Sequence, residues 1–292
     1  MRQRWPHLGY TRRSCIGWQA HVGQSGDEWG RLLGIILRHL AGRQLPHTSV
    51  LANRLLCSRR DRATVATMPK WESGSRVLHE EAGFRYSIAT EERRDEIVRV
   101  LSESFCREPM GVALRVSASD IAPLVERFMP ECTSNGLSVI ATPADEPETV
   151  AGVFISRDFK SALPEGVPEE FPWFLPIGQA LMTVDEAYEE KRRDLKIGDA
   201  VDLWMVGVAE GRFARRGIAS TLFRICSGVA RDRGFMCCVT ECTGHYSQTA
   251  AQRAGFKEVA RLAYKEFRFE GRPVFADIGP PHTHLVLYER EF

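Results

Sequence analysis

The pattern of apolar and polar positions is clearest in the middle of the chain, over residues 203–229. An unbroken apolar run from Leu203 to Val208 has the length of a buried strand and is preceded by Asp202. After a short polar turn, apolar residues recur at Ile218, Leu222, Ile225 and Val229, which places them on one face of a helix. The pattern therefore predicts a strand, a turn and a helix in immediate succession.

Similar patterns predict the other elements. Ahead of this segment we expect a strand at Phe84–Ala89, a helix that follows Thr90 and is ended by Pro109, a helix from an N-cap at Ser119 to Cys132, and strands at Leu137–Thr142 and Val150–Ser156. Behind it we expect a strand at Met236–Thr240, a helix from an N-cap at Ser247 to Ala254, and strands at Val259–Phe269 and His284–Tyr288. These elements predict an α/β (α+β) fold, with helices on both faces of a mixed central sheet of about seven strands.

Residues 160–177 interrupt this alternation with prolines, glutamates and aromatic residues, among them Phe171, Trp173 and Phe174. We expect a long insertion outside the core, and loops of this length are often functional. Two interpretations of the aromatic side chains stay open: they wall a pocket, or they pack the loop onto the core. A polar helix is expected next, at Val184–Asp194.

The first 66 residues differ from the rest in charge, with eleven arginines, no lysine and three acidic residues. We expect residues 1–80 to be an Arg-rich, disordered N-terminal extension and residues 81–292 to form one domain. An Arg-rich and acid-poor start also resembles a mitochondrial transit peptide. Translation upstream of a true start at Met68 would equally explain it.

The composition argues against several classes of protein. The net charge of +1 gives no global field for nucleic acid or a membrane surface, and no apolar stretch is long enough to span a bilayer. The eight cysteines contain no CxxC pair and no zinc-type grouping, so we expect no metal site and a cytoplasmic location, or a mitochondrial one if residues 1–67 are a genuine transit peptide. We expect a monomer without nucleic-acid or membrane partners.

The turn between the central strand and its helix carries the clearest chemistry. Where a strand feeds a helix, the first backbone N–H groups of the helix are unpaired, and with the helix dipole they form an anion site. Gly217 lets a phosphate approach the backbone, and Ala219 and Ser220 keep the entrance small. Three arginines add positive charge there: Arg212, Arg215 and Arg216. The turn predicts a pyrophosphate cradle, with an ordinary solvated turn as the alternative.

The run from Val206 to Ser220, followed one strand later by Gly255-Phe256, resembles the acetyl-CoA-binding core of the GNAT superfamily of N-acetyltransferases. The loop pattern of that superfamily is Gln/Arg-x-x-Gly-x-Gly/Ala, and Gly217 and Ala219 match its last two fixed positions, whereas Ala214 departs from the first. The resemblance implies a GNAT domain at 81–292 that binds acetyl-CoA as cosubstrate. It assigns acetyl-CoA binding to Val206, Gly207, Val208, Arg215, Arg216, Gly217, Ile218, Ala219 and Ser220. Gly207 is suited to the strand bulge that frees backbone donors in this superfamily.

Three further segments look like the arylalkylamine (dopamine) N-acetyltransferase branch of that superfamily. They are Phe105–Met110, which reads FCREPM, Thr243–Ser247, which reads TGHYS, and Pro273–Phe275 with Pro281-His282-Thr283. This resemblance covers most of the chain beyond residue 84. It implies direct transfer of an acetyl group to a small primary amine in a ternary complex, with no metal.

The branch motif implies that Glu108 is the general base and that Thr243 and Ser247 supply hydroxyls, one of which protonates the leaving thiolate or orients the substrate. A carboxylate facing an apolar cleft has a raised pKa, which suits it to accept an ammonium proton. The alternatives are a solvated glutamate beside a proline and a serine that only caps a helix. Two other functions stay open: acetylation of a polyamine, amino acid or protein lysine, and CoA binding without catalysis.

Overall fold

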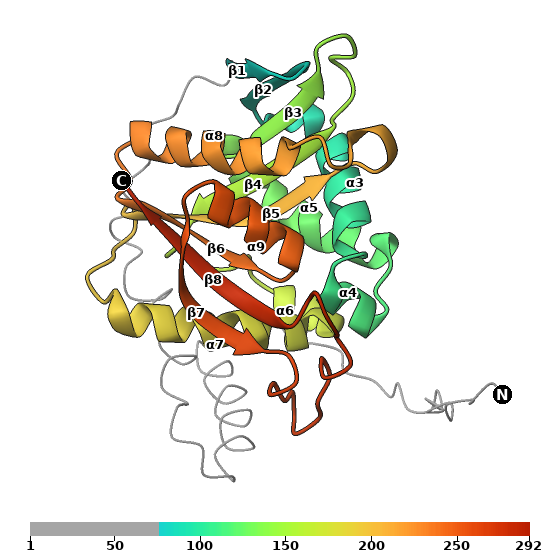
Figure 1. Ribbon diagram of the computed structural model, residues 1–292, viewed down its shortest axis with the longest axis vertical. Coiled ribbons are helices and arrows are strands. Elements are labelled where there is room, and N and C mark those ends of the chain that lie inside the picture. Colours follow the sequence, from blue (N-terminus) through green and yellow to red (C-terminus); the bar gives the residue numbers. More distant parts are fainter. Residues whose placement is uncertain (1–75) are drawn as a thin grey trace, which may run out of the picture. The chain divides into compact units, whose positions relative to one another are not determined.

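The computed structural model describes residues 76–292, which contain one sheet of eight strands (Figure 1). The strands are β1 (Val77–Glu81), β2 (Phe84–Ile88), β3 (Val139–Pro143), β4 (Gly152–Asp158), β5 (Ala200–Val208), β6 (Cys237–Cys242), β7 (Lys257–Ala263) and β8 (His284–Glu291). They lie in the order β1-β2-β3-β4-β5-β6-β8-β7, and every adjacent pair is antiparallel except β5 and β6. The expected mixed sheet is confirmed.

β1 has no counterpart among the expected strands, and it lies across the boundary expected between residues 80 and 81. It is an edge strand that pairs only with β2, and most of its side chains are exposed. Its sequence, VLHEE, lacks the alternation of apolar and polar residues that identifies a half-buried strand, and this is why the sequence did not predict it.

Seven α-helices surround the sheet in the described part of the chain. They are α3 (Arg94–Phe105), α4 (Pro109–Leu114), α5 (Ala118–Ser134), α6 (Val167–Glu170), α7 (Leu175–Lys191), α8 (Ile218–Asp232) and α9 (His245–Arg253). Three short 3₁₀ helices accompany them: η1 (Glu91–Arg93), η2 (Pro172–Phe174) and η3 (Gly211–Phe213). Among residues 76–292, no helix has the length and apolarity needed to cross a membrane.

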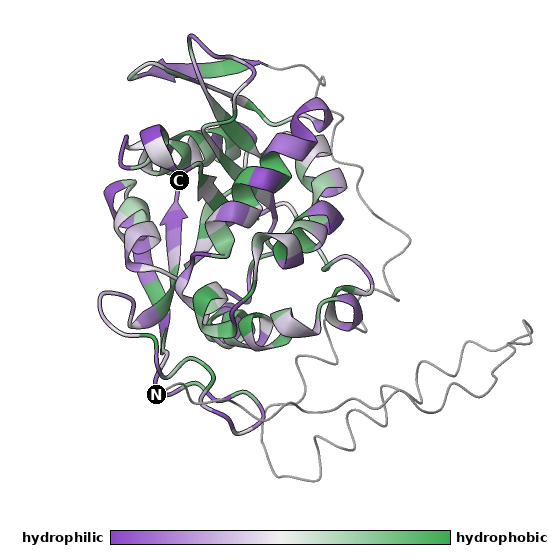
Figure 2. Ribbon diagram, turned by 90° about the vertical axis from the view of Figure 1, so that its right-hand side faces the viewer, coloured by the Kyte–Doolittle hydropathy of each residue, from purple (hydrophilic) through white to green (hydrophobic). Residues whose placement is uncertain are grey.

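Two glycines show that α3 and α8 cover opposite faces of the sheet. A side chain at Gly152 would lie 2.6 Å from Ile218 of α8, whereas one at Gly207 would lie 3.2 Å from Leu101 of α3. Gly207 pairs with Val153, the neighbour of Gly152, and adjacent residues of a strand face opposite sides. Helices therefore flank both faces, as expected, and the apolar colour of Figure 2 is concentrated in the central strands between them.

The sheet splits between β5 and β6. The two strands pair over three residues only, Ala200–Asp202 against Cys237–Val239, although β5 continues to Val208 and β6 to Cys242. The bulge in β5 is at Trp204, because Met205 pairs with Ile155 while Leu203 pairs with Ser156. The expectation of a bulge at Gly207 is therefore wrong; this glycine instead lets α3 lie close to the strand.

Three expected helix ends are also wrong. The helix α3 ends at Phe105, and Pro109 is the first residue of α4, a position that suits proline because its fixed φ is helical and its missing N–H is not needed there. The N-cap of α5 is Ser117 rather than Ser119, in a reciprocal capping box with Asp120. The N-cap of α9 is Gly244, so Ser247 lies inside the helix.

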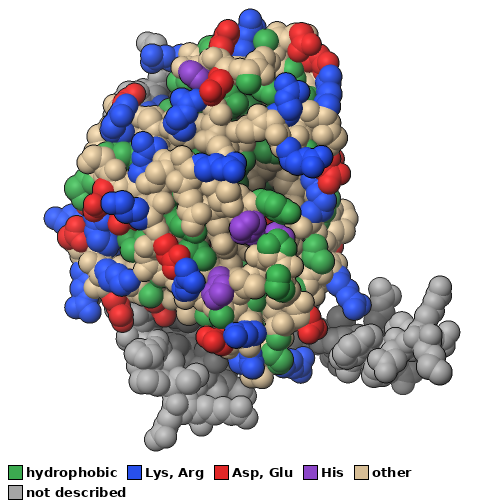
Figure 3. Space-filling model, in the orientation of Figure 1, with side chains coloured by type: hydrophobic (Ala, Val, Ile, Leu, Met, Phe, Trp, Pro, Cys, Tyr) green, Lys and Arg blue, Asp and Glu red, His purple; other side chains and the backbone are tan. Residues whose placement is uncertain are grey.

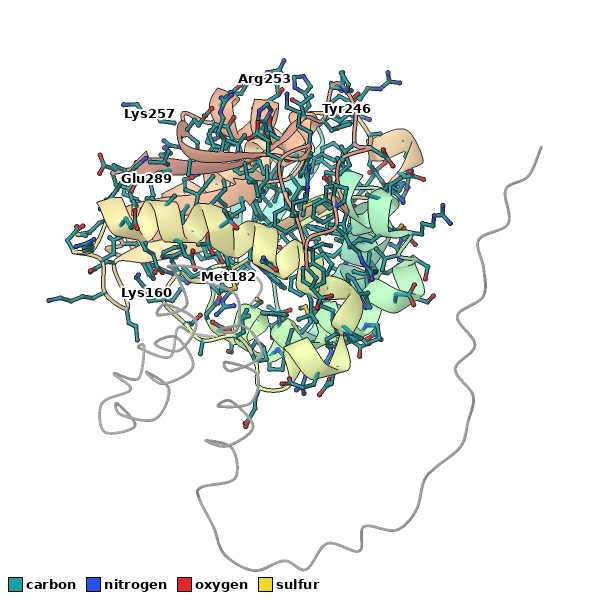
Figure 4. All side chains as sticks on the ribbon, turned by 90° about the horizontal axis from the view of Figure 1, so that it is seen from below. Lys160, Met182, Tyr246, Arg253, Lys257 and Glu289 are labelled. Atoms are coloured by element: carbon teal, nitrogen blue, oxygen red, sulfur yellow. The ribbon has the colours of Figure 1, made fainter. Side chains whose placement is uncertain are left out.

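The segment from residue 160 to 177 is not a plain loop, because it contains α6, η2 and the first residues of α7. The helix α7 begins at Leu175, nine residues before the start expected at Val184. Figure 4 views α7 from below, with Glu289 of β8 labelled beside it. Tyr188 of α7 donates a hydrogen bond of 2.6 Å to Glu289, and Arg192 forms an ion pair with the same carboxylate, which ties α7 to the sheet.

Candidate active site

A cavity lies where β5 and β6 separate. Its walls come from the α3–α4 junction, from η2 and α7, from β5 and from the end of β6. Most of the lining is apolar or aromatic, and the polar lining residues are Glu108, Thr240, Glu241, Thr243 and Ser247. An apolar cavity with a few convergent polar groups is the usual form of a small-molecule site.

Glu108 stands between α3 and α4 as the N-cap of α4, with an extended backbone. Its carboxylate accepts a hydrogen bond of 2.8 Å from the Thr243 hydroxyl. Burial raises the pKa of the Glu108 carboxyl above its ordinary value, and the Thr243 hydrogen bond and the nearby Arg107 guanidinium partly oppose that rise. The structure thus brings together two residues that are 135 positions apart in the sequence.

Two glycines allow this close packing. A side chain at Gly244 would lie 3.0 Å from the Glu108 carboxylate, and one at Gly111 would lie 2.4 Å from the backbone oxygen of Phe105. Only a residue without Cβ therefore lets α4 turn back against the end of α3, which sets the position of Glu108. Neither glycine was singled out from the sequence.

Ser247 also lines the cavity, although the structure gives it a different local role from the one expected. Its hydroxyl donates to the carbonyl of Gly244 at 2.9 Å and accepts from the N–H of Gly244 at 3.3 Å. These bonds brace the first turn of α9. Cys242 lies beside it in the lining, and burial raises the pKa of its thiol, which disfavours a reactive thiolate.

The C-terminal end of β5 leads into the predicted cradle. Gly217 has φ +81° and precedes the first residue of α8, and a Cβ added there would meet no atom within 4 Å. Arg215, Arg216 and Gly217 are exposed, whereas Ile218 is buried against the sheet, so Ile218 can offer only its backbone to a ligand. Lys and Arg side chains are prominent around α8 on the face shown in Figure 3.

Arg212 is less available than its neighbours. Its guanidinium forms a two-pronged ion pair with Glu146 and lies 4.7 Å from the centre of the Phe213 ring. Arg107 is likewise paired, with Glu210 at 2.7 Å. The charge that the sequence suggested for this turn is thus partly neutralised within the protein.

Two of the strand residues expected in the site, Val206 and Gly207, lie in different surroundings. Val206 lines the cavity, whereas Gly207 faces α3, where an added side chain would meet Ser104 and Leu101. Beyond Asp202, β5 is not paired with β6 in the described chain, which leaves backbone groups on that edge available to a ligand. One of them is already used, because the Thr240 hydroxyl donates to the carbonyl of Leu203 at 2.9 Å.

The aromatic residues of the insertion play both roles left open by the sequence. Trp173 and Phe174 line the cavity, with ring centres 5.8 Å apart, whereas Phe171 is buried in the core. Trp204, at the bulge, also lines the cavity and packs on Phe128 with ring centres 3.8 Å apart. The bulge therefore directs an indole into the wall of the site.

Glu241 is a lining residue that the sequence did not reveal. Burial raises the pKa of its carboxyl well above the ordinary value, and the neighbouring carboxylates of Asp202 and Asp185 raise it further. Within β6 it is a single acidic residue in an apolar strand, and no motif marks it. Over residues 76–292, no group of three or more His, Cys, Asp or Glu residues is arranged to hold a metal ion.

Comparisons with known proteins give matches by structure only; no family model and no curated protein sequence matches the chain. Arylalkylamine N-acetyltransferase 2 from Aedes aegypti is 20% identical with a TM-score of 0.60, and the match covers 71% of this chain and 98% of that one. The C-terminal condensation domain of Ebony, in complex with β-alanyl-dopamine, is 18% identical with a TM-score of 0.59, covering 72% and 99%. Polyamine N-acetyltransferase from Drosophila melanogaster is 15% identical with a TM-score of 0.54, covering 72% and 100%.

Identities of this size establish a shared architecture and no more. The described part of this chain therefore shares the fold of these proteins, in agreement with the fold that the resemblance to the GNAT superfamily implied.

Proposed function

We propose that the protein is an acetyl-CoA-dependent N-acetyltransferase that acts on a small primary amine of the arylalkylamine type, by direct transfer in a ternary complex. One observation carries the proposal. The Glu108 carboxylate, held by Thr243, faces an aromatic-walled cavity that opens beside the unpaired edge of β5. The carboxylate that would act as base, the cavity that would hold the amine and the free backbone groups of β5 are therefore adjacent.

The donor half of the site fits acetyl-CoA, which supplies an acetyl group activated as a thioester. The open turn at Gly217 and the first N–H groups of α8 would hold its pyrophosphate, helped by the exposed Arg215 and Arg216. The edge of β5 near Val206 would contact the pantetheine arm and polarise the thioester carbonyl. A single backbone donor of this kind is typically worth roughly 10²–10³ in rate.

The acceptor half depends on Glu108. Glu108 first takes a proton from the ammonium group. The free amine then attacks the acetyl carbon, the C–N bond forms, the C–S bond breaks, and a second proton from the nitrogen goes to the departing thiolate. The raised pKa of Glu108 suits the first proton transfer, because a base is most effective when its pKa is close to the working pH. Ser247, which also lines the cavity, is the candidate to return a proton to the departing thiolate, and for that its hydroxyl must turn away from the Gly244 carbonyl to which it donates.

The aromatic wall supports an aromatic acceptor. Trp173, Phe174 and Trp204 bring three rings to the lining, and aromatic groups stack on or pack edge-to-face against such rings. Arylalkylamines combine a flat ring with a primary amine, which matches this wall and the Glu108 carboxylate at the same time.

A second acceptor class is favoured by a specific observation. Glu241 lines the same cavity, backed by Asp202 and Asp185, and a second carboxyl would suit an acceptor with two cationic ends. Polyamines are such acceptors. Substitution of Glu241 by glutamine would then weaken the reaction with diamines while sparing arylalkylamines.

The experiment is a thiol-release assay on the full chain with acetyl-CoA and a panel of acceptors: phenylethylamine-type amines, linear diamines and lysine-containing peptides. We expect the highest kcat/KM with an aromatic amine and its loss in Glu108→Gln. Preference for a diamine would select the second class. Binding of acetyl-CoA with no thiol release across the panel would overturn the enzyme assignment in favour of a CoA-binding module.

A further inference from the structure

A hydrogen-bonded chain runs from the core to Glu108. The hydroxyl of Tyr264 donates to the backbone carbonyl of Thr243, and the side-chain hydroxyl of Thr243 donates to Glu108 at 2.8 Å. Tyr264 follows directly after β7, and Thr243 lies between β6 and α9. Three segments that are remote in the sequence are thereby joined behind the carboxylate.

Tyr264 is itself held firmly. Its side chain is fully buried, and its ring meets Phe275 edge-on with centres 5.9 Å apart, while Phe275 stacks on Phe267 at 5.4 Å. Its backbone N–H donates to the carbonyl of Thr283 at 3.1 Å. A phenol fixed on all sides in this way is a rigid anchor for the carbonyl that it bonds.

We propose that Tyr264 is a positioning residue for the acetyl transfer: by fixing the Thr243 backbone, it holds the Thr243 hydroxyl on the Glu108 carboxylate. The inference rests on the proposed function for its catalytic meaning and on the geometry alone for the hydrogen-bonded chain. Tyr264 does not line the cavity, and its hydroxyl is engaged with a carbonyl, so it acts through Thr243 rather than on the reacting atoms.

The anchor matters because Thr243 lies in a short connection. Only Thr243 and Gly244 separate the end of β6 from the start of α9, and glycine is the residue most free to rotate. Without the Tyr264 bond, the Thr243 peptide would lose the restraint that aims its side chain. The hydroxyl stabilises the charged form of Glu108, so loosening it favours the protonated form and raises the pKa further.

Other titratable or charged side chains also lie near Glu108. They are Arg107 from the adjoining loop, Cys242 from β6, His282 from the segment before β8, and Tyr264 itself. Arg107 lowers the pKa of the carboxyl, and burial lowers the pKa of His282. Arg107, Cys242 and His282 are all kept when the Tyr264 hydroxyl alone is removed.

The test is Tyr264→Phe in the full chain, which keeps the ring and removes the hydroxyl. We expect the acid limb of the kcat/KM profile for the amine to move to higher pH. The value of kcat/KM at neutral pH should fall by about threefold to tenfold, the range expected for one lost hydrogen bond. An unmoved acid limb would overturn the inference, because a purely structural role would lower stability without changing the titration.

Three further variants keep the test decisive. Thr243→Val should shift the acid limb at least as far as Tyr264→Phe, Thr243→Ser should restore it, and adding Tyr264→Phe to Thr243→Val should shift it no further. Additive shifts in the double variant would mean that Tyr264 acts independently, which contradicts the inference. Tyr288→Phe is the matched control, because Tyr288 is also buried and its hydroxyl accepts from Gln252 at 3.0 Å, outside the cavity lining.

A second readout separates this inference from the proposed function. The side-chain carboxyl of Glu108 can be titrated by carbon-13 NMR, with its resonance assigned from Glu108→Gln. If the unaltered protein transfers no acetyl group, the proposed function fails, while a higher titration midpoint in Tyr264→Phe still supports the hydrogen-bonded chain. Identical midpoints in the two proteins would overturn the chain whether or not the enzyme is active.

Discussion

The proposed site has a donor end, around the turn at Gly217, and an acceptor end, around Glu108, and the two are built from different kinds of group. At the donor end, the groups suited to hold acetyl-CoA are backbone N–H groups at Gly217 and along the strand edge. At the acceptor end, the proposed catalytic groups are the side chains of Glu108 and Thr243, which come from distant segments and are joined by a hydrogen bond. A site built from backbone groups should tolerate changes of side chain such as Ala214, which departs from the loop pattern of the GNAT superfamily. A side-chain site depends on each residue and on whatever positions it.

The largest expected effect concerns the acceptor end. Glu108→Gln removes the base and keeps the shape, so kcat/KM for the amine should fall by roughly 10²–10⁴. In the unaltered enzyme, activity should fall as the pH drops through the pKa of Glu108, which burial has raised, so that this limb lies above the range of an ordinary glutamate. Steady-state rates across pH check both points.

Glu103→Gln supplies the control, because Glu103 lies on α3, the helix before Glu108, and its partly exposed carboxylate pairs with Arg99. It should leave the profile unchanged. If Glu108→Gln retained both the rate and the acid limb, Glu108 would not be the base, and the acceptor end would not depend on its side chain.

The next effect tests whether packing sets the position of the base. A methyl group at Gly111 would lie 2.4 Å from the carbonyl oxygen of Phe105, so Gly111→Ala must move α4 and with it Glu108. We expect a loss of stability of about 1–3 kcal/mol and a fall in kcat/KM of up to roughly 10²-fold. Denaturant titration and kinetics measure the two.

Gly228→Ala is the matched helix variant, since nothing lies within 4 Å of the added methyl. It should stabilise α8 by about 0.5–1 kcal/mol and leave the rate alone. Equal behaviour of the two alanine variants would show that α4 can relax without moving Glu108.

A smaller effect is expected at the donor end. Gly217 has φ +81°, where an L-residue is strained by about 1–2 kcal/mol, although the space for a methyl is free. Gly217→Ala should raise the KM for acetyl-CoA severalfold with little change in the KM for the amine. Gly234→Ala carries similar strain at the far end of α8, with φ +86°, and should lower the melting temperature without affecting acetyl-CoA.

The smallest effect is expected from Arg212→Ala. The Arg212 side chain is exposed and already paired with Glu146, and exposed ion pairs are screened by water, so its removal should leave stability almost unchanged. The KM for acetyl-CoA should rise by less than about threefold, since an exposed pair contributes little. A much larger rise would mean that the donor end relies on side-chain charge, and the distinction drawn between the two ends would fail.

The same distinction explains what could be read from the sequence. The glycine turn and its helix were predictable because a strand, a glycine and an amphipathic helix are consecutive, and backbone sites need little else. The meaning of Gly207 was misread because a glycine in a strand suits a bulge and a close helix contact equally well. Only the paired register reveals that Trp204 is the bulged residue.

The acceptor end was only partly predictable. Glu108 and Thr243 were found through the branch motifs, but their hydrogen bond spans 135 positions and no local pattern encodes it. Pro109 was read as a helix terminator although proline suits the first turn of a helix as well as the residue after one. Glu241 and Tyr264 have no local signature, because their roles arise from what lies across the fold.

The split sheet has a thermodynamic consequence. Only three residue pairs join β5 to β6. A ligand that lies in the gap beyond them would bond to the backbone groups left free there and so connect the two parts of the sheet. Such a ligand binds the folded state alone, and at a concentration one hundred times its dissociation constant it adds about 2.7 kcal/mol to the free energy of unfolding. If acetyl-CoA is that ligand, as proposed, the melting temperature of this protein should rise with the concentration of acetyl-CoA.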